Sequence, residues 1–316
     1  MQHSGVRRAR GTGDPSYRHR WASLINNNEI AKTLDTSSII KPDLPAIRLE
    51  GVRISRSGQL VLDGFNLEVP AGKVTAIMGP SGSGKTTVLK LITGQLKPDA
   101  GRVYVGDIDV CELDRGELND VRRHIGVLLQ NGALLTDMTC FDNVALPLRE
   151  HTRLPENLIE KLVLLKLQAV GLRGAAQMYP QQLSGGMVRR VATARALALD
   201  PDLMLYDEPY AGLDPISLAA IGRLIRQINH VVGITSLVIT HDVAEVSKFA
   251  EYACIMANGK VVACGKPDQL AADGDGDGDG NAVVKQFLNG LPDGPVPFHY
   301  PAPDFEQQLI GEEEGE

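Results

Sequence analysis

The feature that most constrains the fold of this chain is a glycine-rich stretch at residues 79–86, which fits the spacing G-x-x-x-x-G-K-[ST]. A short apolar run at residues 74–78 precedes it, and a helix is expected over residues 86–93. Glycines let successive backbone N–H groups point at one phosphate, and the helix start adds its positive dipole end. The pattern predicts a nucleotide loop in which Lys85 spans the β- and γ-phosphates and Thr86 binds Mg²⁺. The residues expected to contact the nucleotide are Gly79, Pro80, Ser81, Gly82, Ser83, Gly84, Lys85, Thr86 and Thr87.

Two more apolar runs, at residues 203–206 and 236–240, are also short and are followed by polar residues. Strands covered on both faces by helices have this composition. Between these runs, residues 216–232 carry apolar side chains at spacings of three and four, which is typical of a helix. The sequence therefore predicts an α/β fold with a parallel sheet at its core.

Other segments are expected to attach to this core. Residues 47–54 and 60–69 alternate between apolar and polar, which predicts an antiparallel pair of strands at the edge of the domain. Residues 252–256 and 260–264 flank Ala257-Asn258-Gly259, a strong hairpin signal. Residues 131–182 are rich in helix formers and are interpreted as a helical subdomain inserted in the core.

Residues 45–272 are expected to form one domain with an extension at each end. Residues 1–44 contain five arginines but no apolar stretch of the kind an export signal needs, so we expect a disordered basic extension or a start codon assigned too early. Residues 273–280 alternate Asp and Gly, as a linker does. Residues 281–316 are expected to form a helix and a Pro-rich extension. In that extension Phe298, Tyr300 and Phe305 would lie along a partner subunit.

Composition excludes some classes of protein. The formal net charge of −7 argues against a chain that wraps nucleic acid over its whole surface. No apolar run approaches the ~20 residues needed to cross a bilayer, so a connection to a membrane is expected through a partner. The cysteines, Cys111, Cys140, Cys254 and Cys264, show no metal-ligand spacing and are predicted to be free thiols.

Two acids, Asp207 and Glu208, follow the apolar run at residues 203–206. Beside a phosphate loop, this pair predicts an ATPase. Asp207 would hold Mg²⁺ through water, and Glu208 would act as the general base on the attacking water, a role worth roughly 10²–10⁴ in rate.

The stretch Leu183-Ser-Gly-Gly-Met187 precedes a helix expected to extend to about residue 199, with Ser184 as its cap. A second helix start with Ser and Gly donors can close the open side of a bound γ-phosphate. At these residues the sequence resembles the ATP-binding cassette (ABC) family. The resemblance implies a P-loop NTPase fold that binds ATP and Mg²⁺. It also implies a head-to-tail dimer, in which Ser184, Gly185 and Gly186 of one copy cover the ATP of the other.

Further motifs of the ABC family match in order. Gln130 resembles the Q-loop glutamine that contacts Mg²⁺ and water, Asp214 the D-loop aspartate and His241 the switch histidine at the γ-phosphate. Two positions depart from the family pattern. Met187 stands where glutamine is common. Arg56 stands where an aromatic residue usually stacks on adenine, a contact that a guanidinium plane could replace.

Residues 143–152, 163–172 and 293–302 are similar to the ATPase subunits of Mla (maintenance of lipid asymmetry) systems, which move phospholipid between the membranes of Gram-negative bacteria. This resemblance implies an ATP-hydrolysing subunit on the cytoplasmic face of the inner membrane, bound to a transmembrane permease. It also implies a small STAS-domain protein and a periplasmic lipid-binding subunit, and no nucleic acid. Two alternatives stay open: an uptake ATPase for a small polar solute, and a non-transport ABC ATPase.

Overall fold

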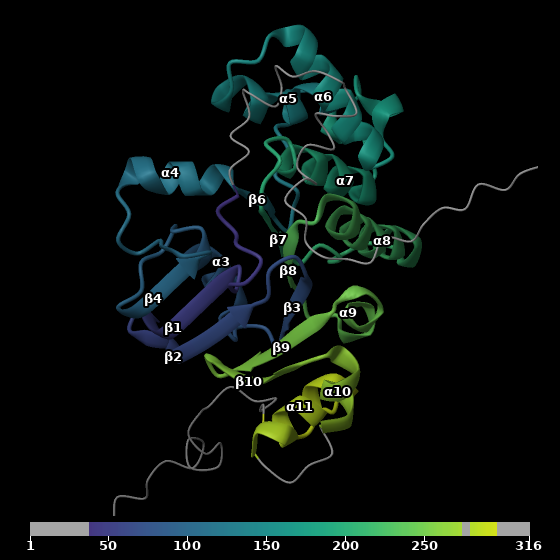
Figure 1. Cartoon of the computed structure of the whole chain (residues 1–316). Coiled ribbons are helices and arrows are strands. Elements are labelled where there is room, and N and C mark those ends of the chain that lie inside the picture. The colour runs from purple at the N-terminus through teal and green to yellow at the C-terminus, as the bar shows by residue number, and fades with distance from the viewer. Residues whose placement is uncertain (1–37, 274–278, 296–316) are drawn as a thin grey trace, which may run out of the picture.

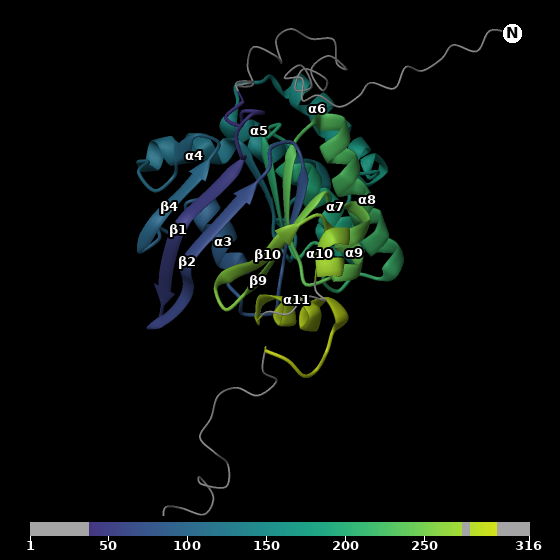
Figure 2. The ribbon, with the colours of Figure 1, turned by 60° about the horizontal axis from the view of Figure 1, so that its bottom comes forward.

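The computed structural model describes residues 38–273 and 279–295. It has a six-stranded sheet in the order β10-β9-β3-β8-β7-β6 and a four-stranded sheet in the order β2-β1-β4-β5. Helix α3 and the four-stranded sheet cover one face of the larger sheet, and α7, α8 and α9 cover the other (Figures 1 and 2). Helices α5 and α6 pack on α7. This layered arrangement confirms the predicted α/β class.

The larger sheet is built on the apolar runs of the sequence. They form β3 (Val74–Met78), β7 (Leu203–Asp207) and β8 (Thr235–Ile239), in which every residue is buried. Strand β3 pairs in parallel with β8, β8 with β7, and β7 with β6 (Ile125–Leu128). On the other side, β9 (Tyr252–Ala257) is parallel to β3 and forms an antiparallel hairpin with β10 (Lys260–Gly265), as predicted.

The smaller sheet contains the predicted antiparallel pair, β1 (Ile47–Arg56) and β2 (Gln59–Val69). The sequence analysis missed its other two strands, β4 (Ala100–Val105) and β5 (Ile108–Asp109). Side chains of β1 and β2 pack with the buried face of α3 (Lys85–Ile92) in one apolar cluster. Helix α3 is thereby fixed between the two sheets (Figure 1).

Helices fill the remaining connections. None of the helices in the described ranges is long and apolar enough to cross a membrane. Between β6 and α7 lie α5, α6 and two short 3-10 turns, at the end of the molecule farthest from the β9–β10 hairpin (Figure 1). The bounds are α4 Arg115–Arg123, α5 Cys140–His151, α6 Glu156–Ala169, α7 Gly185–Ala196, α8 Pro215–Val232, α9 Val243–Phe249, α10 Pro267–Asp273 and α11 Asp279–Asn289.

The expected extensions are only partly visible. Residues 1–37, 274–278 and 296–316 lie outside the described residues, so the basic extension, most of the Asp/Gly linker and the Pro-rich tail are not described. At the N-terminal side, the Ser38 hydroxyl donates to Asp202 Oδ1 (2.6 Å), and the Ile39 N–H donates to Asp202 Oδ2 (3.2 Å). The chain is therefore anchored to the core ahead of residue 45.

The prediction of four free thiols was wrong for Cys254 and Cys264. These residues lie opposite each other in the β9–β10 hairpin and form a disulfide. A register shift between Val261 and Ala263 causes this pairing. Counting from the turn without that shift would place Ala263 opposite Cys254. Cys111 and Cys140 are free.

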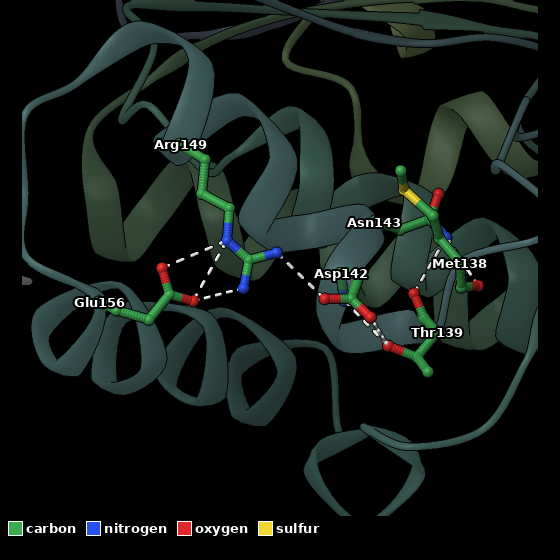
Figure 3. Close-up of polar contacts among 6 residues, drawn as sticks. All are labelled: Met138, Thr139, Asp142, Asn143, Arg149 and Glu156. Atoms are coloured by element: carbon green, nitrogen blue, oxygen red, sulfur yellow. Dashed lines mark hydrogen bonds and ion pairs between the residues drawn. The ribbon is translucent and has the colours of Figure 1, made fainter.

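A buried asparagine holds the loop before α5. Asn143 is fully buried, its Oδ1 accepts from the Leu135 N–H (2.8 Å), and its Nδ2 lies 3.0–3.2 Å from the carbonyl oxygens of Leu135, Met138 and Thr139. Figure 3 shows this side chain beside Met138 and Thr139. One amide side chain thus takes the place of several backbone hydrogen bonds in a segment with no regular structure.

Beside it, Arg149 ties α5 to α6. Its guanidinium donates to Asp142 Oδ1 (3.0 Å), two turns earlier on α5, and to Glu156 at the start of α6 (Figure 3). The hydrogen bond from Arg149 lowers the pKa of Glu156 below its usual range. The pKa of Asp142 is also lowered, mainly by the hydrogen bond with Thr139 and further by Arg149.

We predict that Asn143→Ala lowers the free energy of unfolding by about 2–3 kcal/mol, because the substitution leaves buried backbone groups of the loop without partners. Urea denaturation followed by circular dichroism measures this. Asn119→Ala, at an exposed asparagine of α4, is the matched control and should change stability by less than about 0.5 kcal/mol. Equal effects of the two substitutions would contradict the structural role of Asn143.

Candidate nucleotide-binding site

The glycine-rich loop joins the end of β3 to the start of α3, as the sequence predicts. Gly79 has φ 148° and lies so close to the Met256 carbonyl oxygen of β9 that a Cβ would overlap it. Gly84 caps α3 with φ 99°, and a Cβ there would lie 2.9 Å from Leu62 Cδ2. Both positions therefore require glycine on steric and conformational grounds.

Lys85 points into the curve of this loop. It is 7% exposed, and its Nζ donates to the carbonyl oxygens of Gly79 and Pro80, both at 2.8 Å. Burial lowers the pKa of Lys85, and the charges of Glu208 and Asp207 act in the opposite direction. A cation held inside a loop of N–H groups at a helix N-terminus can bind an anionic phosphate.

The predicted acids lie at the carboxyl end of β7, on the same edge of the sheet as the loop. Asp207 is 9% exposed, and burial raises its pKa, with a further rise from Glu208 and an opposing effect of Lys85. A buried carboxyl with a second acid next to it favours a bound cation. Carboxylate and hydroxyl oxygens are the ligands that Mg²⁺ prefers, so Asp207 and the exposed Thr86 at the start of α3 fit this ion.

Glu208 and His241 meet, although they are far apart in the sequence. His241 Nδ1 lies 2.9 Å from Glu208 Oε2. Glu208 has φ 46°, an uncommon conformation for a residue other than glycine, and its N–H donates to the Ile239 carbonyl (2.9 Å). That bond to the end of β8 fixes where the Glu208 backbone turns, and His241 stands two residues beyond the same strand end.

Gln130 lies in the exposed loop after β6, and a residue that the sequence analysis did not single out holds this loop. The Arg189 guanidinium on α7 donates to the Gln130 carbonyl (3.1 Å) and to the Ala211 carbonyl. Arg195, two turns further along α7, donates to the carbonyls of Gly132 (2.8 Å) and Ala133 (2.7 Å). The sequence did not indicate the role of these two arginines, because their hydrogen-bond partners are backbone carbonyls and not side chains with a recognisable pattern.

The predicted serine-glycine segment starts α7. Ser184 caps the helix by accepting from the Met187 N–H (3.3 Å), and a Cβ on Gly186 would lie 2.8 Å from Ser217 Oγ of α8. Asp214 caps α8 by accepting from the N–H groups of Ile216 and Ser217, both at 3.0 Å. Ser184, Gly185 and Asp214 are exposed.

Two groups of predicted residues stay apart from the loop of Lys85. Within residues 38–273 and 279–295, no hydrogen bond or ion pair joins Ser184, Gly185, Gly186 or Asp214 to residues 79–87. Arg56, exposed at the end of β1 opposite Gln59, likewise makes no such bond to that loop. Val61 and Leu62 of β2, and not Arg56, lie nearest to the position that a Cβ on Gly84 would take.

Several known proteins are similar in sequence to this chain over most of its length. The family model described as "ABC transporter" matches residues 62–211. The intermembrane phospholipid transport system ATP-binding protein MlaF of Haemophilus influenzae is 52% identical over 84% of this chain and 98% of its own length. MlaF of Escherichia coli K12 is 48% identical over 84% and 96%. A probable ribonucleotide transport ATP-binding protein of Mycobacterium leprae is 38% identical over 79% and 71%.

Solved structures agree with the sequences. A dimeric ATP-binding cassette in a post-hydrolysis state, bound to ADP and Pi, has a TM-score of 0.64 and 35% identity over 70% of this chain and 98% of that one. The cbiO1 protein of Clostridium perfringens, part of an ABC transporter complex, has a TM-score of 0.69 and 28% identity over 79% and 97%. The chain therefore belongs to the ABC transporter family of ATP-binding proteins.

Proposed function

We propose that this chain is the ATP-hydrolysing subunit of an ABC transporter that moves phospholipid between the inner and outer membranes of a Gram-negative bacterium. The observation that carries this proposal is identity of 52% and 48% over nearly the whole length of two phospholipid transport ATPases. Identity to a ribonucleotide transport relative is lower, at 38%. This difference favours phospholipid over a small polar solute.

ATP binds with its phosphates in the loop of residues 79–87. The Lys85 ammonium then donates to phosphate oxygens in place of the Gly79 and Pro80 carbonyl oxygens. Charge favours this exchange, because a phosphate is an anion and a carbonyl is neutral. Thr86, Gln130 and Asp207 would hold Mg²⁺, which supplies positive charge to the phosphates. Arg56 would stack on the adenine base.

Hydrolysis depends on Glu208 and His241. Glu208 takes a proton from the attacking water, and its fixed backbone turn aims the carboxylate. His241 lies 2.9 Å from that carboxylate, so it can orient Glu208 while its own ring reaches toward the γ-phosphate. Because both residues follow neighbouring strands, their spacing is set by the sheet rather than by flexible loops.

A second copy of the chain completes each site. Ser184, Gly185 and Gly186 lie at the start of α7, where Ser184 and Gly185 are exposed and Gly186 is buried. In a head-to-tail dimer this helix start faces the γ-phosphate bound by the other copy, and Asp214 lies between the two sites. The dimeric cassette bound to ADP and Pi supports this arrangement.

The transmembrane permease docks beside the loop of Gln130. Leu129 and Leu135, which border that loop, are 46% and 40% exposed. Apolar side chains at such a site can receive a partner's helix. The subunit then lies at the cytoplasmic face of the inner membrane, where a STAS-domain protein and a periplasmic lipid-binding subunit join the complex.

Glu208→Gln is expected to bind ATP with normal affinity and to hydrolyse it at least about 100-fold more slowly, because the amide cannot accept the proton of water. Phosphate release and binding of a fluorescent ATP analogue measure the two properties separately. Glu112→Gln, at an exposed acid outside the site, should behave as wild type. Normal turnover by Glu208→Gln would refute the general base.

The shared site predicts that two inactive variants complement each other. Lys85→Ala and Ser184→Arg should each abolish hydrolysis alone. When both chains are purified as mixed dimers through two different tags, one of the two sites has an intact loop and an intact Ser184. The rate should return to about half that of wild type, since a twofold dimer has two equivalent sites. No recovery would favour a site built within one chain.

The Pro-rich tail is expected to stabilise the dimer. Deleting residues 291–316 should weaken dimerisation about tenfold, which corresponds to about 1.4 kcal/mol. Analytical ultracentrifugation measures the dimer dissociation constant. Replacing Phe298, Tyr300 and Phe305 together with serine keeps the prolines and should have a similar effect. Unchanged dimerisation of the deletion variant would rule out this docking.

A further inference from the structure

The β9–β10 hairpin carries the disulfide found in the structure. Cys254 of β9 is fully buried, whereas Cys264 of β10 is exposed. The two Cα atoms are 4.1 Å apart. Strand β9 also pairs with β3, and Cys254 stands opposite Ile77 there. The disulfide therefore links the edge strand β10 to β9, and β9 is the neighbour of β3, which leads into the nucleotide loop.

The same hairpin lies directly against the first residue of the nucleotide loop and reaches the other end of the loop only through β2. At the first end, the Met256 carbonyl oxygen presses against Gly79 so closely that no side chain fits between them. At the other end, a Cβ on Gly259 of the hairpin turn would overlap the Val61 carbonyl oxygen of β2, and a Cβ on Gly84 would lie 3.4 Å from Val61 Cγ1. Val61 therefore lies between the hairpin turn and this end of the loop. The Gly259 carbonyl also accepts a hydrogen bond from the Asp63 N–H (3.4 Å). A shift of the hairpin would therefore change the space available to Gly79 and the position of β2 beside Gly84.

We infer that the Cys254–Cys264 disulfide is a redox-sensitive modification site that sets the affinity of the loop for nucleotide. This inference rests on the nucleotide site of the proposed function. The proposed function also puts the chain at the cytoplasmic face of the membrane, a reducing compartment in which a disulfide is usually transient and regulatory rather than structural. Here one sulfur is exposed to solvent thiols, and the other is buried against the strand beside the loop.

The exchange needs a small-molecule thiol such as glutathione as reductant. Its thiolate attacks the exposed Cys264 Sγ, the Sγ–Sγ bond breaks, and Cys254 leaves as a thiolate that takes up a proton. A second glutathione thiolate attacks the glutathione sulfur of this mixed disulfide, so oxidised glutathione is released and Cys264 leaves as a thiolate that takes up a proton. Two electrons pass from two glutathione molecules to the protein, and oxidised glutathione reverses the reaction.

Reduction changes how firmly β10 is held. Among the strands that the structure describes, β10 pairs with β9 alone, and a register shift interrupts that ladder between Val261 and Ala263. Without the disulfide, the edge strand and the Asn258–Gly259 turn depend on this interrupted ladder and on side-chain packing. The contacts of the turn with β2 then loosen, and the loop is held less well in the shape that binds phosphate.

The test uses the full chain prepared with oxidised or with reduced glutathione. Iodoacetamide labelling of the denatured protein and intact mass should show two labelled cysteines after oxidation and all four after reduction. The dissociation constant of a fluorescent ATP analogue, measured by titration, should be about fivefold higher for the reduced protein, which equals about 1 kcal/mol.

Cys264→Ser removes the exposed sulfur without disturbing the buried one. Its dissociation constant should match that of reduced wild type and should no longer respond to glutathione. Cys111→Ser is the control, because Cys111 is a free thiol whose pKa is raised by burial, and this variant should keep the full response. Four labelled cysteines after oxidation, or equal affinity in both redox states, would overturn the inference. Failure to bind the analogue in either state would instead refute the nucleotide site.

Discussion

The candidate site depends on the parallel pairing of β3, β8 and β7, because this pairing brings three separate loops to one edge of the sheet. Ile239 of β8 stands opposite Ile77 of β3 and opposite Asp207 of β7. The loop that leads to Lys85 follows β3, and His241 follows β8. The loop, His241 and Asp207 therefore lie at the same edge of the sheet. A slip of one residue in this register would turn every buried side chain of a strand to the other face.

Burial acts on Lys85 and Asp207 in opposite directions, and in both cases it disfavours the charged form. In the free protein, the charge of Asp207 raises the pKa of Lys85 and the charge of Lys85 lowers the pKa of Asp207, so each group counteracts the effect of burial on the other. An anionic phosphate beside Lys85 and a cation beside Asp207 would each favour the charged form. Attraction between charges is stronger where water is excluded. Under the proposed function, the burial that is unfavourable in the free protein would therefore strengthen the binding of ATP and Mg²⁺.

The sequence predicts those parts of the fold that depend on neighbours along the chain. The apolar strands, the hairpin turn and the Ser184 cap follow from local composition and spacing, and the structure has them where they are expected. Features set by distant contacts escaped prediction. Strand β4 starts with exposed residues and owes its place to β1. The Cys254–Cys264 pair depends on a single register shift that composition does not reveal.

The guanidinium groups on α7 illustrate the same limit and also explain how distant parts of the site can act together. Arg189 and Arg195 bind backbone carbonyls of residues 130–133 and of Ala211, so the loop of Gln130 is attached to the helix that Ser184 caps. Burial lowers the pKa of both arginines. Under the proposed function, a permease that moves the loop beside Leu135 would move α7 with it. Since α7 starts at the residues that would cover the second nucleotide, one displacement at the permease side would reach both copies of the site.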